Sequence, residues 1–214
     1  MSSIGEVIAR LAPYNLKPRT MMSVGAGAGA DTPWYMRRLG LERALLIEAQ
    51  AAHLPALDGL KGSDARIDYL LCVAHERDGE CRFAATAPTG GAISVGGTLH
   101  RTRSIDSIAR ERKLLGPFFL KLDTHGAEVS VLRGAAATLA ETELVLMEVY
   151  NFKLGFTGRS NLTFDEMSLY MKSHGFYPAA IADPLARPRD GILWQMQMFF
   201  VRTDNAAFDE FGFK

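Results

Sequence analysis

Short apolar runs alternate with amphipathic stretches along most of this chain. The runs predict strands, because each is brief and three of them stop at a glycine or an acidic residue. The predicted strands cover residues 21–24, 45–47, 69–74, 118–122 and 144–149. Stretches with helical spacing separate most of them, and strands that alternate with helices favour a parallel sheet covered by helices.

The helices are predicted from apolar residues that recur every three or four positions. The first lies at the N-terminus on Ile4, Val7, Ile8 and Leu11, and the second lies on Leu54, Leu57 and Leu60 and ends before Gly62. A short helix begins at Ser104, and another runs from Ala127 to about Gly134. The last lies on Phe164, Met167 and Met171, has capping-box spacing at Thr163 and Glu166, and ends at Gly175. We expect the N-terminal helix to pack on the domain, with a membrane-surface or partner-binding helix as the alternative.

Turn signals and two extended segments complete the pattern. Asp78-Gly79 predicts a hairpin turn, and the stretch 84–97, rich in Gly and Thr, predicts a hairpin or a mobile loop. Segments 176–181 and 192–201 lie close enough in sequence to pair antiparallel. Since no repeat or linker interrupts the chain, we expect one domain over residues 1–214, with a lead-in at 1–19, a core at 20–202 and a tail at 203–214.

A glycine-rich turn follows the first predicted strand. Gly25, Gly27 and Gly29 alternate with alanines, and Asp31 or Thr32 can cap a helix whose first turn holds Pro33. Strand, glycine turn and helix in this order are typical of a nucleotide-cofactor domain, because glycine lets the backbone turn sharply and approach a ligand. The spacing fits both a dinucleotide and S-adenosylmethionine, and a turn that serves only the fold is a third reading.

An acidic residue after the second predicted strand narrows the choice. Glu48 lies 23 positions after Gly25, where a carboxylate can accept hydrogen bonds from ribose hydroxyls. A carboxylate also repels the 2′-phosphate of NADP. S-adenosylmethionine and NAD therefore both remain open on these residues alone.

Charge and cysteine content limit the partners and the compartment. The chain has 24 Lys and Arg and 24 Asp and Glu, so no net field favours nucleic acid or an anionic membrane. Of the two cysteines, Cys72 lies in an apolar run, which indicates a buried thiol in a reducing compartment. The first residues lack the layout of a signal peptide. We expect a cytoplasmic protein that binds neither nucleic acid nor membranes.

Three later stretches carry a family resemblance. Residues 121–135 hold the run Lys-x-Asp-x-x-Gly-x-Glu-x-x-x-Leu-x-Gly from Lys121 to Gly134, residues 147–150 read Met-Glu-Val-Tyr, and residues 190–195 read Asp-Gly-Ile-Leu-Trp-Gln. With Ser104-Ile105-Asp106 ahead of them, they resemble the FkbM family of S-adenosylmethionine-dependent methyltransferases over roughly residues 20–202. The chain departs from that family by having Ser23 where Asp is frequent and His125 where Glu is frequent.

The resemblance implies a fold, a cofactor and a reaction. The expected fold is the class I methyltransferase (Rossmann-like) α/β sandwich: a seven-stranded, mostly parallel sheet with helices on both faces and one antiparallel C-terminal strand. The expected cofactor is S-adenosyl-L-methionine, and the expected reaction is O-methylation of a hydroxyl on a small metabolite or sugar. An NAD-dependent oxidoreductase and a non-catalytic, cofactor-binding regulatory protein are the alternatives, and the oligomeric state is left open.

The candidate site follows from where ligands bind parallel sheets, at the carboxyl ends of the strands. The residues expected to bind the cofactor are Ser23, Gly25, Ala26, Gly27, Gly29, Glu48, Ala49, Ala74, His75 and Asp123. His125 is the candidate base, because an imidazole accepts protons near neutral pH. Asp123 or Glu148 would orient the base or the acceptor. The alternatives are that His125 only caps the turn, and that His75 is solvated surface.

Four further features could belong either to the fold or to the site. Glu128 falls in the first turn of a helix, where a carboxylate is favourable without any catalytic role. Asp123, His125 and Glu148 could hold a divalent ion, but no established metal motif is present and we expect no metal. Trp194 belongs to the core by default and could wall the acceptor pocket, and the aromatic, glycine-containing stretch 150–161 suits a substrate-covering loop.

Overall fold

A seven-stranded sheet forms the centre of the computed structural model, which describes residues 2–87, 90–155 and 159–209. The strand order is β10-β11-β9-β8-β1-β2-β3. The strands are β1 (Thr20–Val24), β2 (Arg43–Glu48), β3 (Ile67–Leu71), β8 (Phe118–Leu122), β9 (Thr142–Tyr150), β10 (Phe176–Ala186) and β11 (Leu193–Arg202).

The pairing of these strands confirms the expected fold class. β1 lies between β2 and β8 and is parallel to both, and β2–β3 and β8–β9 are also parallel pairs. β11 runs antiparallel to β9 and to β10, and is the antiparallel strand near the C-terminus. β1, β2 and β8 therefore present their carboxyl ends at one edge.

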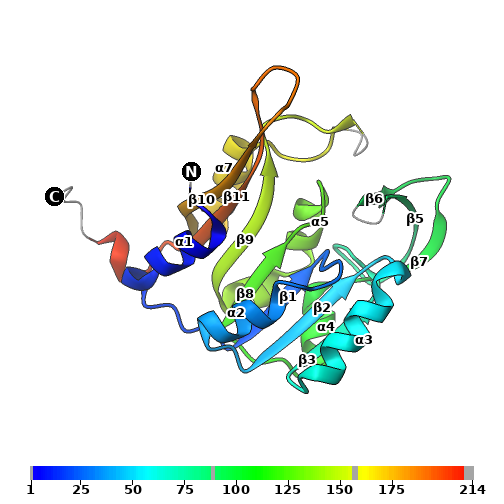
Figure 1. The fold of residues 1–214 in the computed structure, drawn as a ribbon, viewed down its shortest axis with the longest axis horizontal. Helices are drawn as coiled ribbons and strands as arrows, with labels where there is room; N and C mark the ends of the chain where they lie inside the picture. Colours follow the sequence, from blue (N-terminus) through cyan, green and yellow to red (C-terminus); the bar gives the residue numbers. More distant parts are fainter. Residues whose placement is uncertain (1, 88–89, 156–158, 210–214) are drawn as a thin grey trace.

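Helices cover both faces of the sheet (Figure 1). One face packs against α1 (Ile4–Arg10), α2 (Thr32–Leu39) and α3 (Leu54–Ser63), and the other against α4 (Ile105–Glu111), α5 (Glu128–Arg133), α6 (Ala136–Ala140) and α7 (Phe164–Ser173). Three short 3₁₀ helices are η1 (Ala12–Tyr14), η2 (Ala51–His53) and η4 (Ala206–Phe208). Each face has its own buried cluster, because apolar residues alternate between the two sides of β1, β8 and β9. Within the described ranges, every helix falls short of what a bilayer crossing requires.

Local signals explain the starts of two helices. Ser3 and Glu6 form a capping box at α1, and the capping box at Thr163 and Glu166 of α7 is confirmed. The expectation that α1 packs on the domain is also confirmed, since Val7 and Ile8 are buried against the sheet. One boundary differs from the prediction, since α3 continues through Gly62 to Ser63, and one further helix, α6, was not predicted.

The start of α2 contradicts the expected cap. Asp31 occupies the N-cap position, but its side chain makes no capping hydrogen bond. Its carboxylate accepts instead from Lys121 Nζ of β8, at 2.7 Å. The Thr32 hydroxyl is buried with no partner among the described residues. The predicted cap is wrong because a long-range ion pair takes the capping carboxylate.

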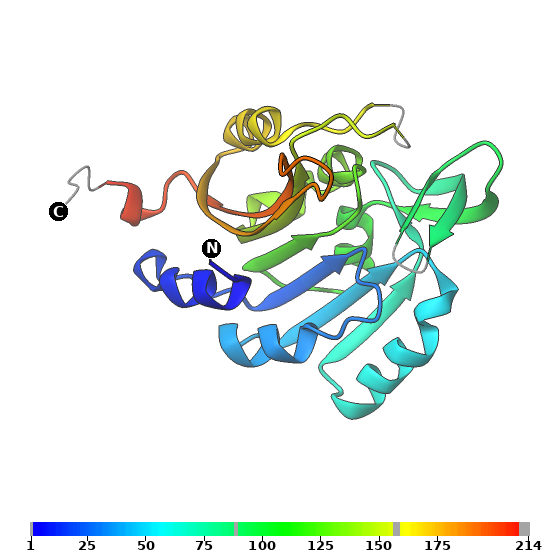
Figure 2. The same cartoon turned by 45° about the horizontal axis from the view of Figure 1, so that its top comes forward.

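A second, four-stranded sheet stands beyond the carboxyl ends of β1 and β2 (Figure 2). Its order is β4-β7-β5-β6, with β4 (Val73–Ala74), β5 (Gly79–Ala87), β6 (Gly90–Ile93) and β7 (Thr98–Arg103). The predicted single strand 69–74 is therefore wrong, because the chain leaves the large sheet at Cys72. Asp78-Gly79 does not close a hairpin either, since β4 and β5 both pair with β7. The hairpin expected at 84–97 is confirmed as β5–β6, apart from residues 88–89, which lie outside the described residues.

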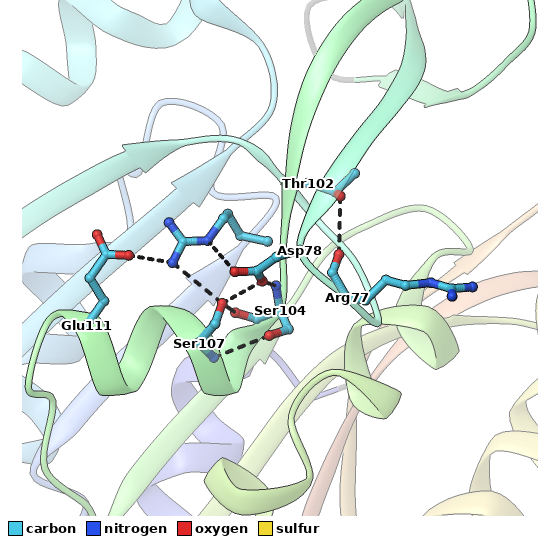
Figure 3. A network of polar contacts seen from close by, with 7 residues as sticks. Arg77, Asp78, Thr102, Ser104, Ser107 and Glu111 are labelled. Atoms are coloured by element: carbon cyan, nitrogen blue, oxygen red, sulfur yellow. Dashed lines mark hydrogen bonds and ion pairs between the residues drawn. The ribbon is translucent and has the colours of Figure 1, made fainter.

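Asp78 ties this small sheet to the main domain (Figure 3). Its carboxylate accepts from the Ser107 hydroxyl at 2.6 Å, the Ser104 amide at 2.8 Å and Arg103 Nε at 3.1 Å. Arg103 in turn reaches Glu111 at 2.5 Å. The hydroxyl of Ser107 and the amide of Ser104 lower the pKa of Asp78 to about 2. The network thus joins β7 to α4 through one ionised carboxylate.

We predict that Asp78→Asn destabilises the fold by about 1 kcal/mol near neutral pH, because hydrogen bonds to a charged acceptor are lost at a half-exposed position. The folded pKa lies below that of a free Asp, so the stabilisation is complete above about pH 4 and is lost as the pH falls toward 2. Urea unfolding of both proteins between pH 6 and pH 3 checks this.

The matched control is Glu80→Gln, which removes an exposed carboxylate from the same sheet. The gap in unfolding free energy between wild type and Asp78→Asn should narrow at acid pH, whereas Glu80→Gln should stay close to wild type throughout. A gap for Asp78→Asn that does not change with pH would contradict the assignment.

Candidate active site at the carboxyl edge of the sheet

A cavity of about 770 Å³ opens where β1, β2 and β8 end. It is lined by the loops that follow these strands and by Phe83, Ala92 and Ile93 of the small sheet. The predicted residues that line it are Gly25, Ala26, Gly27, Gly29, Glu48, Ala49, Ala74, His75, Asp123 and His125. Residues that the sequence placed in separate loops therefore meet around one space.

The glycine turn is shaped by its contact with the neighbouring loop. Gly25 has a φ of 70°, and a Cβ at this position would lie 2.0 Å from the carbonyl oxygen of Asp123. The Asp123 amide also donates to the Val24 carbonyl at 2.9 Å. Gly27, with a φ of 55°, has only the His53 ring near its missing Cβ, at 3.9 Å. Gly25 thus permits the two loops to pack, while Gly27 leaves its side of the cavity open.

Glu48 organises the same turn. Its buried carboxylate accepts from the Gly27 amide and from the Gln50 amide, both at 2.8 Å. Each carboxylate oxygen has two lone pairs, so each can accept a further hydrogen bond from the cavity side. The carboxylate both fixes the glycine turn and offers an acceptor to a ligand.

His125 lies between two carboxylates. Its Nε2 is 3.7 Å from Asp123 Oδ1 and 3.7 Å from Glu148 Oε1, beyond hydrogen-bond distance from either. Ligand atoms of the three residues all lie within 4.8 Å of one another, as a cluster that could hold a metal ion would require. His125 also has a φ of 51°, a left-handed conformation that costs a non-glycine residue energy and is concentrated at functional sites.

Glu148 is held from behind. Tyr150 donates to its Oε1, and Gln195 Nε2 donates to its Oε2 at 2.8 Å. Burial raises the pKa of Glu148, which favours its protonated form. Glu148 is not among the residues that line the cavity, and within the described chain it reaches the site through His125.

Glu128 stabilises the loop that carries His125. Its buried carboxylate accepts from the Thr124 hydroxyl at 2.9 Å and from the Gly126 amide at 3.0 Å. Burial raises the pKa of this carboxyl group. These contacts give Glu128 a structural role at the start of α5, as its place in the first helical turn predicts.

Two predicted features lie away from the cavity lining, and a third contributes to it in part. Ser23 is buried within β1, and the lining begins at Val24 in the part of the chain that the structure describes. Trp194 stacks on Phe152 at 5.4 Å between ring centroids and is likewise no part of that lining among the described residues. Of the predicted covering loop 150–161, residues 156–158 lie outside the described residues, and Ser160 lines the cavity.

The sequence reading missed several lining residues. Lys121 and Asp31 reach the cavity as an ion pair, His53 faces the glycine turn, and Arg133 lies at the rim with its side chain 62% exposed. The signal for Lys121 was present, since it is the charged residue in an otherwise apolar strand. The others depend on contacts between distant segments.

Comparison with known proteins identifies a family and several solved structures with a similar fold. Residues 23–178 match the family model described as the methyltransferase FkbM domain. No curated protein sequence matches the chain. Among solved structures, the FkbM methyltransferase of Methylobacillus flagellatus is similar with a TM-score of 0.56 and 18% identity, over 84% of this chain. This chain spans only 43% of the length of that protein.

Two further structures share the fold with little sequence identity. The N-methyltransferase NodS of Bradyrhizobium japonicum aligns with a TM-score of 0.55 and 9% identity, over 92% of this chain and 93% of its own. Sp1610 of Streptococcus pneumoniae, whose proposed activity is tRNA (m1A22) methylation, aligns with a TM-score of 0.53 and 11% identity, over 94% and 70%. Since the family model covers well over half of the sequence, this chain belongs to the FkbM methyltransferase family.

Proposed function

We propose that this chain is an S-adenosylmethionine-dependent O-methyltransferase that acts on a hydroxyl of a small metabolite or sugar. The proposal rests chiefly on one observation: His125 sits between the Asp123 and Glu148 carboxylates at the wall of the glycine-lined cavity. The family supplies the methyltransferase chemistry, and this cluster supplies what a hydroxyl acceptor needs, a group that takes its proton.

The cavity fits the methyl donor in two respects. The Glu48 carboxylate keeps free lone pairs that can accept hydrogen bonds from ribose hydroxyls. Ala49, Val73 and Ala74 line the neighbouring wall, and their small apolar side chains suit a flat purine face. When bound, S-adenosylmethionine would supply an activated methyl group on its sulfonium, with the neutral thioether S-adenosylhomocysteine as the leaving group.

The residues of this chain would remove the proton of the acceptor hydroxyl and align the acceptor with the methyl group. His125 Nε2 accepts the proton of the acceptor hydroxyl, and the nearby Asp123 carboxylate stabilises the positive charge that the ring gains. Glu148, anchored by Tyr150 and Gln195, limits the movement of the ring on its other side. Phe83 and Ile93 line the same cavity and offer apolar surface against which a small acceptor could be oriented.

The nature of the acceptor is the finer part of the proposal. NodS methylates nitrogen and Sp1610 is assigned to RNA, so the fold by itself serves several acceptors. A histidine base favours a hydroxyl, because an alcohol has to lose its proton as it attacks the methyl group, whereas a neutral amine attacks through its nitrogen lone pair. The balance of 24 basic and 24 acidic residues argues against RNA.

We predict that the purified protein binds S-adenosylhomocysteine in isothermal titration calorimetry and does not bind NAD under the same conditions. The carboxylate at Glu48 and the open side of Gly27 suit either ribose, but the family match favours the sulfonium compound. Tight binding of NAD with no response to S-adenosylhomocysteine would overturn the assignment in favour of an oxidoreductase.

We predict that Glu48→Gln weakens S-adenosylhomocysteine binding by about 10- to 100-fold, the range expected when one charged hydrogen-bonding group is lost. The amide would also place an N–H donor against a backbone N–H donor. Glu42→Gln, at an exposed ion pair with Arg19, is the matched control and should bind like wild type. Equal affinities for wild type and Glu48→Gln would exclude Glu48 from the ligand site.

We predict that His125→Ala lowers turnover by about 10²- to 10⁴-fold, the usual contribution of a positioned base, while changing the Kd of S-adenosylhomocysteine by less than about threefold. The assay needs an acceptor, found by screening hydroxylated sugars and metabolites, with amines and tRNA included, for a mass gain of one methylene. His174→Ala, on the exposed end of α7, is the control.

Three outcomes would count against the role of His125: loss of binding and turnover together, loss of neither, or a methylated nitrogen in the product. Wild-type protein that binds the cofactor yet methylates nothing in the panel would instead favour a non-catalytic, cofactor-binding protein.

A further inference from the structure

A charged pair on the cavity wall has no part in the proton chemistry described above. Lys121 is the charged residue of β8, and its side chain is only 10% exposed. Its Nζ lies 2.7 Å from Asp31 Oδ2 and 6.0 Å from the centre of the Tyr35 ring. Lys121 and Asp31 both line the cavity.

The pair leaves hydrogen-bonding capacity on both sides. An ammonium has three N–H donors, and among the described residues Lys121 Nζ uses one hydrogen bond, to Asp31. Asp31 stands at the N-cap of α2 without capping it, and its side chain is 41% exposed. Burying a cation is costly unless its remaining donors find partners. The remaining donors of Lys121 and acceptors of Asp31 therefore favour a ligand that carries both a negative and a positive group.

The chemistry of the pair selects a zwitterion. A free anion near Lys121 would also meet the Asp31 carboxylate, and a free cation near Asp31 would meet the Lys121 ammonium. An α-amino acid group carries a carboxylate and an ammonium on one carbon, so it can satisfy both partners at once and leave the site neutral. Bidentate recognition of this kind is both stronger and more selective than a single contact.

The strand order places the pair on the opposite side of the glycine turn from Glu48. β1 lies between β2, which ends in Glu48, and β8, which carries Lys121. Lys121 and Asp123 are two residues apart on a strand and so face the same side. The glycine turn after β1 therefore lies between Glu48, which can accept from a ribose, and the charged pair of Lys121 and Asp31. S-adenosylmethionine has a matching layout, because its ribose and its amino acid group are on different substituents of the sulfonium sulfur.

We propose that Lys121 and Asp31 bind the α-amino acid end of S-adenosylmethionine, with Lys121 contacting the carboxylate and Asp31 the ammonium. This inference rests on the proposed function.

The test compares ligands that differ only at that end. Calorimetry measures the Kd of S-adenosylhomocysteine, of its decarboxylated analogue and of 5′-methylthioadenosine, which lacks the amino acid altogether. Wild type should bind S-adenosylhomocysteine at least tenfold more tightly than either truncated ligand. Lys121→Met and Asp31→Asn should each weaken S-adenosylhomocysteine by about 10- to 100-fold and change 5′-methylthioadenosine by less than about twofold.

Lys61→Met removes an exposed lysine that pairs with Asp68 and is the matched control, with all three affinities expected to equal those of wild type. The comparison of ligands on wild-type protein needs no variant, so it can overturn the inference even if Lys121→Met fails to fold. Wild type with equal affinity for the three ligands would overturn the inference alone. Equal weakening of all ligands in Lys121→Met would also overturn it, by giving Lys121 a structural role. Wild type that binds none of the three would overturn the proposed function as well.

Discussion

The close approach of the Gly25 backbone to the Asp123 carbonyl is the constraint on which the site depends. A Cβ at position 25 would lie 2.0 Å from that oxygen, so no other residue fits without separating the loops. The contact brings the end of β1 against the end of β8. It thereby sets the glycine turn, which Glu48 holds through the Gly27 amide, beside the loop that carries His125.

Electrostatic groups are divided around this junction by the strand order. Glu48 lies on the β2 side, the Lys121–Asp31 pair on the β8 side, and the cluster of Asp123, His125 and Glu148 follows the ends of β8 and β9. The buried members each have a local partner: backbone amides for Glu48, the Asp31 carboxylate for Lys121 and a tyrosine hydroxyl for Glu148, which lowers the cost of burial. The small sheet completes the enclosure, and Asp78 holds it to α4.

The sequence predicted those parts of the molecule that depend on local pattern. Strand runs, the glycine turn, the Thr163–Glu166 capping box and the motif around Asp123 and His125 each occupy a short stretch, so periodicity and spacing revealed them. It failed where distant segments compete for the same group. Asp31 pairs with Lys121 across 90 residues of sequence instead of capping α2, and Asp78 binds residues of α4 instead of turning a hairpin. Neither long-range contact can be recognised from the periodicity of hydrophobic residues.

A crystal structure of the protein soaked with S-adenosylhomocysteine tests the central claim most directly. The account predicts electron density in the cavity beside the glycine turn, with ribose hydroxyls within hydrogen-bond distance of the Glu48 carboxylate and the sulfur facing His125. Density elsewhere on the protein, or a ligand in the cavity that leaves Glu48 and His125 out of contact, would contradict it.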